Sequence, residues 1–350
     1  MEQYIIKGGI PLVGDVEIGG AKVRAAGLRF SCEPYSGPFR KEDGLPEIDA
    51  PMDEFWFDLP AKWHPPVTWN RAKGPDGRRH NVIEAEAFTG QPQQTAWTET
   101  LAQIKAVGDI GLQRGLNRYF LHTCPLQPFA DDVRPGMTMG RWGTHFGRTQ
   151  TWARPAGAAW FAHQRRCQAL LQWGEPSDKR LGMKDVRKIS RTDGDRTIHF
   201  IVNKISGESR FYDDKTGRWY DPVTGAIRDS YESESVVMQL EHFEPALGDR
   251  SKSNDPAVRY YSGTLTYRTR FDLPKAGGVL ALRFPDPADQ VYVVRVNGKL
   301  AGTVWGRPWM VELPVAALKE KGNELEIDVT NSWRNRLIGD EQEPADCEFE

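Results

Sequence analysis

The chain has 350 residues, enough for about two domains at roughly 150 residues each. Its 39% hydrophobic and 27% charged residues are ordinary for a globular protein, which excludes a chain disordered over most of its length. The 46 basic and 48 acidic residues leave a net charge of −2, which argues against a general nucleic-acid-binding protein. No apolar run approaches the roughly 20 residues that span a membrane, and the N-terminus lacks the apolar segment of a secretory signal.

The cysteines and tryptophans indicate which kinds of site the chain can contain. The four cysteines lie far apart without a CxxC pair, which excludes a zinc knuckle and a dense disulfide framework. We therefore expect most of them to be buried free thiols. The 12 tryptophans are a large share, and indole rings offer flat apolar surfaces that suit the C–H faces of sugar rings.

Short apolar runs alternate with helical segments from Arg24 to about Trp173. The pattern predicts strands at 27–34, 48–57 and 81–90, a helix at 98–115, a strand at 116–123 and a helix at 156–174. Strands separated by helices favour parallel β/α units, as in a β/α barrel.

The pattern changes after Lys179 to strands and tight turns. A polar connection at 230–256 precedes closely spaced strands from Ser262 onward, and Asn297–Gly298 predicts a two-residue hairpin turn. These strands predict an antiparallel β-sandwich at 257–350, in which Trp333 packs where the last strand meets the barrel side. The expected organisation is an N-terminal arm at 1–23, a barrel-type segment at 24–178, a β-rich connecting region at 179–256 and the sandwich.

Acidic residues and one histidine follow the predicted strands of the barrel-type segment. Glu33, Glu54, Glu86 and His122 fall at strand ends, where the working residues of a β/α barrel gather, so we predict that they converge on one concave face. A glycosidase needs two carboxyl groups, about 5 Å apart for retention or roughly 6.5–9.5 Å apart for inversion. The alternative is that some of these acids form ion pairs at the barrel rim. Glu84 is interpreted as a structural or metal-side acid.

Several motifs occur in the order found in a known family. They include APMDEFW, EAEAFTG, LHTCPLQPF, RPGMTMGRWGTHFGRTQTW, ARPAGAAWFAHQRRCQALLQWG, WYDPVTG, YYSGTLTYRTRF and VTNSWRNRLIGD. In these motifs the chain resembles the α-L-rhamnosidases of glycoside hydrolase family 106. The resemblance implies a (β/α)8 catalytic barrel, a C-terminal galactose-binding-like sandwich, inverting hydrolysis of terminal α-L-rhamnose and a calcium ion in the active site.

The resemblance also implies roles for individual residues. Glu86 in EAEAFTG corresponds to the general base that activates water, and Glu54 in MDEFW to an acid of the calcium-and-substrate site. The remaining candidates for binding the rhamnose-containing substrate are Glu33, His122, Gln127, Thr144 and His145. The other histidines, His80, His163, His199 and His242, are interpreted as surface or core residues.

The chain departs from the family pattern in two places. Leu126 stands where the family usually has a second histidine, and no segment matches the earlier strand that carries the family's general acid. Because the resemblance begins near Arg24, at the fifth strand, we expect only the second half of the barrel. We therefore predict weak or no hydrolysis by this chain alone. Its open sheet edges should self-associate or be covered by the N-terminal arm as an added strand. The family is typically exported, and this chain shows no export signal.

Residues 1–22 resemble the start of UDP-N-acetylglucosamine enolpyruvyl transferases, where GGAK carries a substrate-binding lysine, here Lys22. Val23 replaces the expected asparagine and nothing further follows that pattern, so we interpret the arm as a foreign start. Two alternatives to the hydrolase stay open. One is a non-catalytic carbohydrate-binding protein whose Trp-rich sandwich binds sugar, and the remote one is an enolpyruvyl transferase.

Overall fold

The computed structural model describes residues 3–6, 20–32, 48–57, 73–90, 95, 97–130, 132–137, 144–179, 181–231, 236–238, 249–273, 279–284, 287 and 290–342. The chain divides into two compact units. The first unit comprises Met1–Gln91, Ala106–Thr123 and Ala162–Tyr231, and the second comprises Pro92–Lys105, Cys124–Phe161 and Glu232–Glu350. Among the described residues no helix is long and apolar enough to cross a membrane.

The first unit contains a five-stranded parallel sheet, curled like half of a barrel. Its strands, in spatial order, are β1 (Gln3–Ile6), β2 (Arg29–Cys32), β3 (Ala50–Trp56), β4 (Glu84–Thr89) and β5 (Arg118–Leu121). The last four lie inside the predicted strands. β1 comes from the N-terminal arm and pairs in parallel with β2, so the arm covers one edge of the sheet.

Helix α3 (Leu101–Gln113) approaches this sheet closely through its glycines. A Cβ at Gly111 would lie 2.8 Å from Tyr119 Oη and 3.1 Å from Phe55 Cζ. The Tyr119 hydroxyl donates to the Gly108 carbonyl at 2.8 Å, and burial raises its pKa well above the usual value. Because Phe55 alternates with Glu54 along β3, the helix packs on the face opposite that acid.

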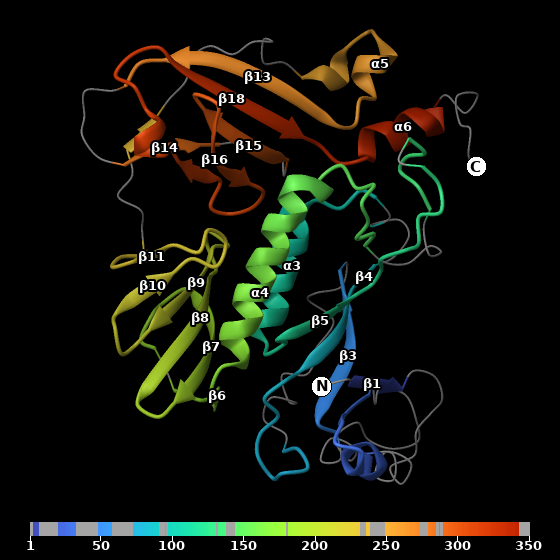
Figure 1. Ribbon diagram of the computed structural model, residues 1–350, viewed down its shortest axis with the longest axis vertical. Helices are drawn as coiled ribbons and strands as arrows, with labels where there is room; N and C mark the ends of the chain where they lie inside the picture. The colour runs from blue at the N-terminus through green and yellow to red at the C-terminus, as the bar shows by residue number, and fades with distance from the viewer. Residues whose placement is uncertain are drawn as a thin grey trace. The chain divides into compact units, whose positions relative to one another are not determined.

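A six-stranded antiparallel sheet completes the first unit. Its order is β11 (Ile227–Arg228), β10 (Arg218–Tyr220), β9 (Ser209–Asp213), β8 (Arg196–Asn203), β7 (Val186–Asp193) and β6 (Glu175–Ser177). Its residues Phe200 and Phe211 share a core with Cys167 and Leu171 of helix α4 (Ala158–Gln172), which lies beside it in Figure 1.

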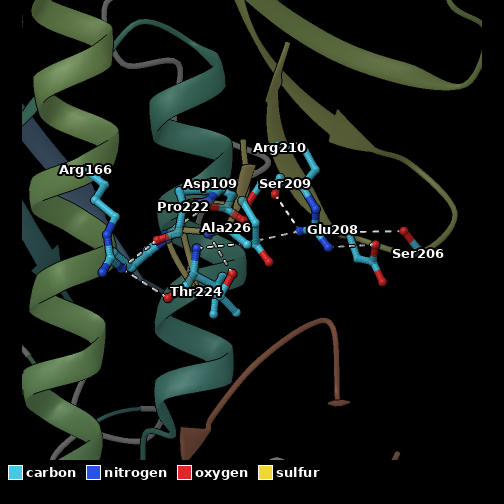
Figure 2. A network of polar contacts seen from close by, with 12 residues as sticks. Asp109, Arg166, Ser206, Glu208, Ser209, Arg210, Pro222, Thr224 and Ala226 are labelled. Atoms are coloured by element: carbon cyan, nitrogen blue, oxygen red, sulfur yellow. Dashed lines mark hydrogen bonds and ion pairs between the residues drawn. The ribbon is translucent and has the colours of Figure 1, made fainter. Parts of the chain in front are cut away.

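Helix α4 is also tied to the turn between β10 and β11. Arg166 donates from Nη1 to the carbonyls of Pro222 and Val223, both at 3.2 Å, as Figure 2 shows. Gly225 in this turn has φ +84° and lies against the Arg166 guanidinium, so the turn needs a residue without a side chain. The sheet and the helix are therefore held at this end by polar contacts as well as by the apolar core.

The second unit holds two sheets around one core. The larger is antiparallel, in the order β13 (Thr264–Phe271), β18 (Asn323–Thr330), β15 (Val291–Val296) and β16 (Lys299–Val304). The smaller contains β12 (Val236–Met238), β14 (Leu280–Arg283) and β17 (Met310–Glu312), with β12 parallel to β14. Leu282, Val294 and Ile327 belong to their common core. Asn297 and Gly298 have φ values of 49° and 76°, which confirms the predicted hairpin turn.

Short helical segments also occur, and residues 20–25 are one of them. Others have named bounds. They are η2 (Ala153–Gly157), η3 (Arg250–Lys252), α5 (Pro256–Arg259), η4 (Val315–Ala317) and α6 (Arg334–Gln342). Trp333, just before α6, donates from Nε1 to the Thr149 carbonyl at 2.9 Å, so it contacts the barrel-type stretch of sequence as expected. Cys32 and Cys167 are buried free thiols, Cys124 is exposed, and Cys347 lies outside the described residues.

Candidate active site

Two glutamates lie side by side on neighbouring strands of the parallel sheet. Glu54 on β3 is the register partner of Glu86 on β4, so both side chains emerge on the same face. Adjacent strands lie about 4.8 Å apart, which lets one sugar ring reach both carboxylates. His122 directly follows β5, and its Nε2 lies 3.7 Å from Glu86 Oε1. The predicted convergence is confirmed for these three residues, and Glu33 lies outside the described residues.

Neighbouring side chains orient this trio. Trp56 donates from its indole Nε1 to Glu54 Oε2 at 2.8 Å, and Thr89 Oγ1 lies 3.4 Å from His122 Nδ1. The side chains of Glu86 and His122 are 13% and 19% exposed, so water reaches both. Sequence reasoning missed Trp56 and Thr89. Trp56 stands two positions after Glu54 along a strand, and that two-residue spacing was the available signal.

Glu84 has a different environment from Glu86 although only Ala85 separates them. Its side chain is fully buried, accepts from Arg118 Nη1 at 2.7 Å and accepts from Ser31 Oγ at 2.5 Å. A buried carboxylate held by two donors joins β2, β4 and β5. Glu84 is thus a structural acid, one of the two roles expected for it.

The other predicted substrate contacts belong to the second unit. Gln127 uses both ends of its amide on Met137, donating to the carbonyl at 2.7 Å and accepting from the backbone N–H at 2.8 Å. His145 is fully buried and stacks on Trp97 with the ring centroids 4.6 Å apart. Thr144 is also fully buried. Their roles as sugar contacts stay predictions. Gln127 joins its loop to Met137 and His145 packs on Trp97, whereas the buried Thr144 hydroxyl has no hydrogen-bond partner among the described residues.

The predicted calcium site has Glu54 as its named ligand among the described residues. Within them no group of three His, Cys, Asp or Glu side chains could hold a metal ion. Calcium takes six to eight oxygen ligands, whereas Glu54 brings one carboxylate, one oxygen of which already accepts from Trp56. The calcium ion therefore stays a prediction, and no step proposed below passes through it.

The region that contains these candidate residues is similar to a known protein family. Residues 47–179 match the family model for α-L-rhamnosidases of glycoside hydrolase family 106. This stretch, about two fifths of the chain, is similar to family 106. The matched segment contains Glu54, Glu86 and His122, together with the three candidates of the second unit. Nothing in the comparisons bears on the enolpyruvyl transferase resemblance of residues 1–22, which stays a prediction.

Individual relatives extend this assignment. A rhamnosidase from Novosphingobium sp. PP1Y has a TM-score of 0.70 at 16% identity, covering 95% of this chain and 52% of that one. At that identity the likeness shows the fold. A Formosa agariphila protein with the provisional name β-glucuronidase is 35% identical over 149 residues, which are 43% of this chain and 12% of that protein. The chain thus spans about half of the solved rhamnosidase and about an eighth of the curated relative. The family and both relatives are glycoside hydrolases.

The other histidines and Leu126 differ in their burial. His80, His163 and His199 are buried, the core alternative of the two predicted for them, and His242 lies outside the described residues. Leu126 is 82% exposed, so the position where the family usually has a histidine here carries an apolar side chain in solvent.

Proposed function

We propose that this chain acts on α-L-rhamnosides as an inverting glycoside hydrolase of family 106, with Glu86 as the general base. The observation that carries the proposal is the in-register pair Glu54 and Glu86 with His122 3.7 Å from Glu86. The Glu86 carboxylate would take a proton from water as the water oxygen bonds to the anomeric carbon. In the same step the glycosidic bond would break, and its oxygen would take a proton from a general acid.

Glu54 and His122 would position the sugar beside Glu86. The Trp56 indole fixes one oxygen of Glu54, which leaves the other to accept from a rhamnose hydroxyl. His122 follows β5 and faces Glu86, so its imidazole can bond a hydroxyl or hold the Glu86 carboxylate in place. If a calcium ion binds, its ligands would include Glu54, and it would orient sugar hydroxyls.

The general acid limits the activity expected from this chain. No sequence segment matches the family strand that carries it, and a positioned acid or base each contributes about 10²–10⁴-fold. We therefore expect binding of L-rhamnose together with weak or no turnover. The half-barrel sheet would also pair with a second copy through its uncovered edge.

The test uses the full chain, with and without calcium, in two measurements. Saturation-transfer NMR reports binding of L-rhamnose, and 4-nitrophenyl α-L-rhamnoside reports turnover, with 4-nitrophenyl β-D-glucuronide as a second arm because of the Formosa relative's name. Glu86→Gln should remove any residual rhamnoside turnover while rhamnose still binds, and exposed Glu320→Gln is the matched control.

Three outcomes contradict the proposal. These are no binding of rhamnose, turnover of the glucuronide but not the rhamnoside, and robust rhamnoside turnover that survives Glu86→Gln. The last would show that another residue supplies the base. Terbium luminescence with Glu54→Gln tests the calcium site without relying on activity, because Tb³⁺ occupies oxygen-rich calcium sites.

A further inference from the structure

The second unit contains a polar cavity that the proposed hydrolase site does not use. It has a volume of about 240 Å³ and lies at the end of the larger sheet where β13 begins and β18 ends. Leu265 and Val329, which are register partners, form its floor, and residues beside α5 and α6 form its rim. Figure 1 shows both helices at this end of the sheet. The volume corresponds to on the order of eight water molecules, which suits a single sugar ring.

The rim of the cavity is rigid. Asn331 donates from Nδ2 to the Tyr261 carbonyl at 2.9 Å and accepts at Oδ1 from the Gly263 N–H at 2.8 Å. The Tyr261 hydroxyl in turn donates to the Thr264 carbonyl at 2.9 Å. The rim is thus fixed by its own hydrogen bonds before any ligand arrives, which lowers the entropic cost of binding.

Arg250 supplies a cation that pairs with no acid among the described residues. Its Nε is buried and makes no hydrogen bond, and no ion pair involves its guanidinium within the described part of the chain. The nearby Asp249 is already engaged, since its carboxylate accepts from Ser251 and pairs with Lys252 at 3.2 Å. The Ser251 hydrogen bond, followed by that of Lys252, holds the pKa of Asp249 below its usual value. A guanidinium left uncompensated beside a cavity favours an anionic ligand, because its planar fork matches a carboxylate.

Other polar groups in the cavity suit hydroxyls rather than a second charge. Tyr267 and Gln290 both line it, and the structure gives the Tyr267 hydroxyl and the Gln290 side-chain amide no hydrogen bond to a described residue. Asn335 adds a carbonyl oxygen, because only its Nδ2 is used, in a 3.4 Å bond to Tyr261. These groups can both donate and accept, as sugar hydroxyls require, and the apolar floor can take the C–H face of a ring.

We propose that this cavity is a non-catalytic binding site for a hexuronic acid residue of an acidic glycan. The carboxylate pairs with Arg250, the ring hydroxyls bond to Gln290 and Tyr267, and the ring rests on Leu265 and Val329. The site lies within the second unit and does not depend on the rhamnosidase activity. It would hold the chain to a uronate-containing polymer whatever bond the first unit acts on.

The test is calorimetric titration of the full chain with sodium D-glucuronate, D-glucose and inorganic phosphate. We expect glucuronate to bind at least tenfold more tightly than glucose, because glucose lacks the carboxylate that Arg250 recognises. Arg250→Gln should weaken glucuronate binding by about 10- to 100-fold, the range of one charge-assisted hydrogen bond. Gln290→Ala should weaken glucuronate and glucose alike.

Arg270→Gln is the matched control, because Arg270 is a 77%-exposed arginine of the same unit outside the cavity lining. It should leave glucuronate binding unchanged, and thermal melts should show that both arginine variants remain folded. Phosphate binding as tight as glucuronate, with no effect of Gln290→Ala, would identify a general anion site and overturn the sugar assignment. Absence of glucuronate binding, or equal losses in the two arginine variants, would overturn the site itself. None of these results depends on rhamnoside binding, so the proposed function fails or stands separately.

Discussion

Glu84 and Glu86 lie two residues apart on β4, and we assign a structural role to the first and a catalytic role to the second. Glu84 and Glu86 can each be replaced by glutamine, which keeps the shape of the side chain and removes the charge. Glu84 is fully buried and bonded to Arg118 and Ser31, whereas Glu86 lies 3.7 Å from His122, beyond hydrogen-bonding distance. We expect Glu84→Gln to destabilise the protein more than Glu86→Gln does.

The magnitude follows from the contacts of Glu84. Its carboxylate accepts two hydrogen bonds, and bonds to a charged group contribute about 1.5–3 kcal/mol each. Glutamine has one acceptor oxygen, so it keeps one bond and turns its amide N–H groups toward the other donor. Because the Arg118 side chain is 29% exposed, water can solvate the released guanidinium in part. The net loss should be about 2–3 kcal/mol, or a decrease of roughly 4–10 °C in melting temperature.

The assay is thermal unfolding of both variants beside the unaltered chain, together with rhamnose binding by NMR. Glu86→Gln should lower the melting temperature less than Glu84→Gln does, because the Glu86 side chain is 13% exposed and the Glu84 side chain is fully buried. Equal losses of stability in the two variants would refute the division of roles. So would a Glu84→Gln variant that melts normally but fails to bind rhamnose.

Three further predictions concern the supports of the sheets. Gly111→Ala should destabilise by about 1–2 kcal/mol in denaturant unfolding, since crowding against Tyr119 outweighs the gain in helix propensity, and Tyr119→Phe should reduce that cost. Gly225→Ala should cost about 1–3 kcal/mol because of its φ of +84°, whereas Gly182→Ala, with open space around it, should be neutral. Burial, opposed by the bond to Asp214, lowers the pKa of His199, so the fold prefers the neutral imidazole. Its contribution should be complete above about pH 6.5 and lost as the pH falls below that value, and His199→Gln should flatten this part of the stability profile.

The sequence predicted the elements of both units because their patterns are local. Each of β2 to β5 lies within its predicted strand, and α3 and α4 are two or three residues shorter at each end than predicted. The hairpin at Asn297–Gly298 followed from two residues that adopt positive φ readily. The sequence predicted either self-association or pairing of the N-terminal arm at the sheet edge, and the structure shows the arm, as β1, paired with β2. Sequence alone could not choose between them, because any strand that reaches an open edge can satisfy its backbone groups.

For the candidate site, the sequence predicted which residues share a face of the sheet, but not which partners each of them has. Glu54 and Glu86 share a face because they are register partners inside β3 and β4, not at the strand ends as predicted, and His122 directly follows β5. Parity alone cannot separate Glu84 from Glu86, which point to the same side of β4. What separates them is the neighbouring strands, since Arg118 and Ser31 reach one acid and not the other.

For residues in loops, residue type alone did not predict which side chains are available to bind a ligand. Gln127 has a side chain that could bond sugar hydroxyls, and in the fold both ends of its amide bond the backbone of Met137. Arg250 lies in a polar connection that sequence reasoning left without a role, yet it is a cation with no acid partner among the described residues. In both cases the deciding fact is which partners the fold brings within 3 Å, and that depends on contacts between segments far apart in the chain. A polar loop residue is therefore a candidate for binding only once the fold shows which of its atoms are still unpaired.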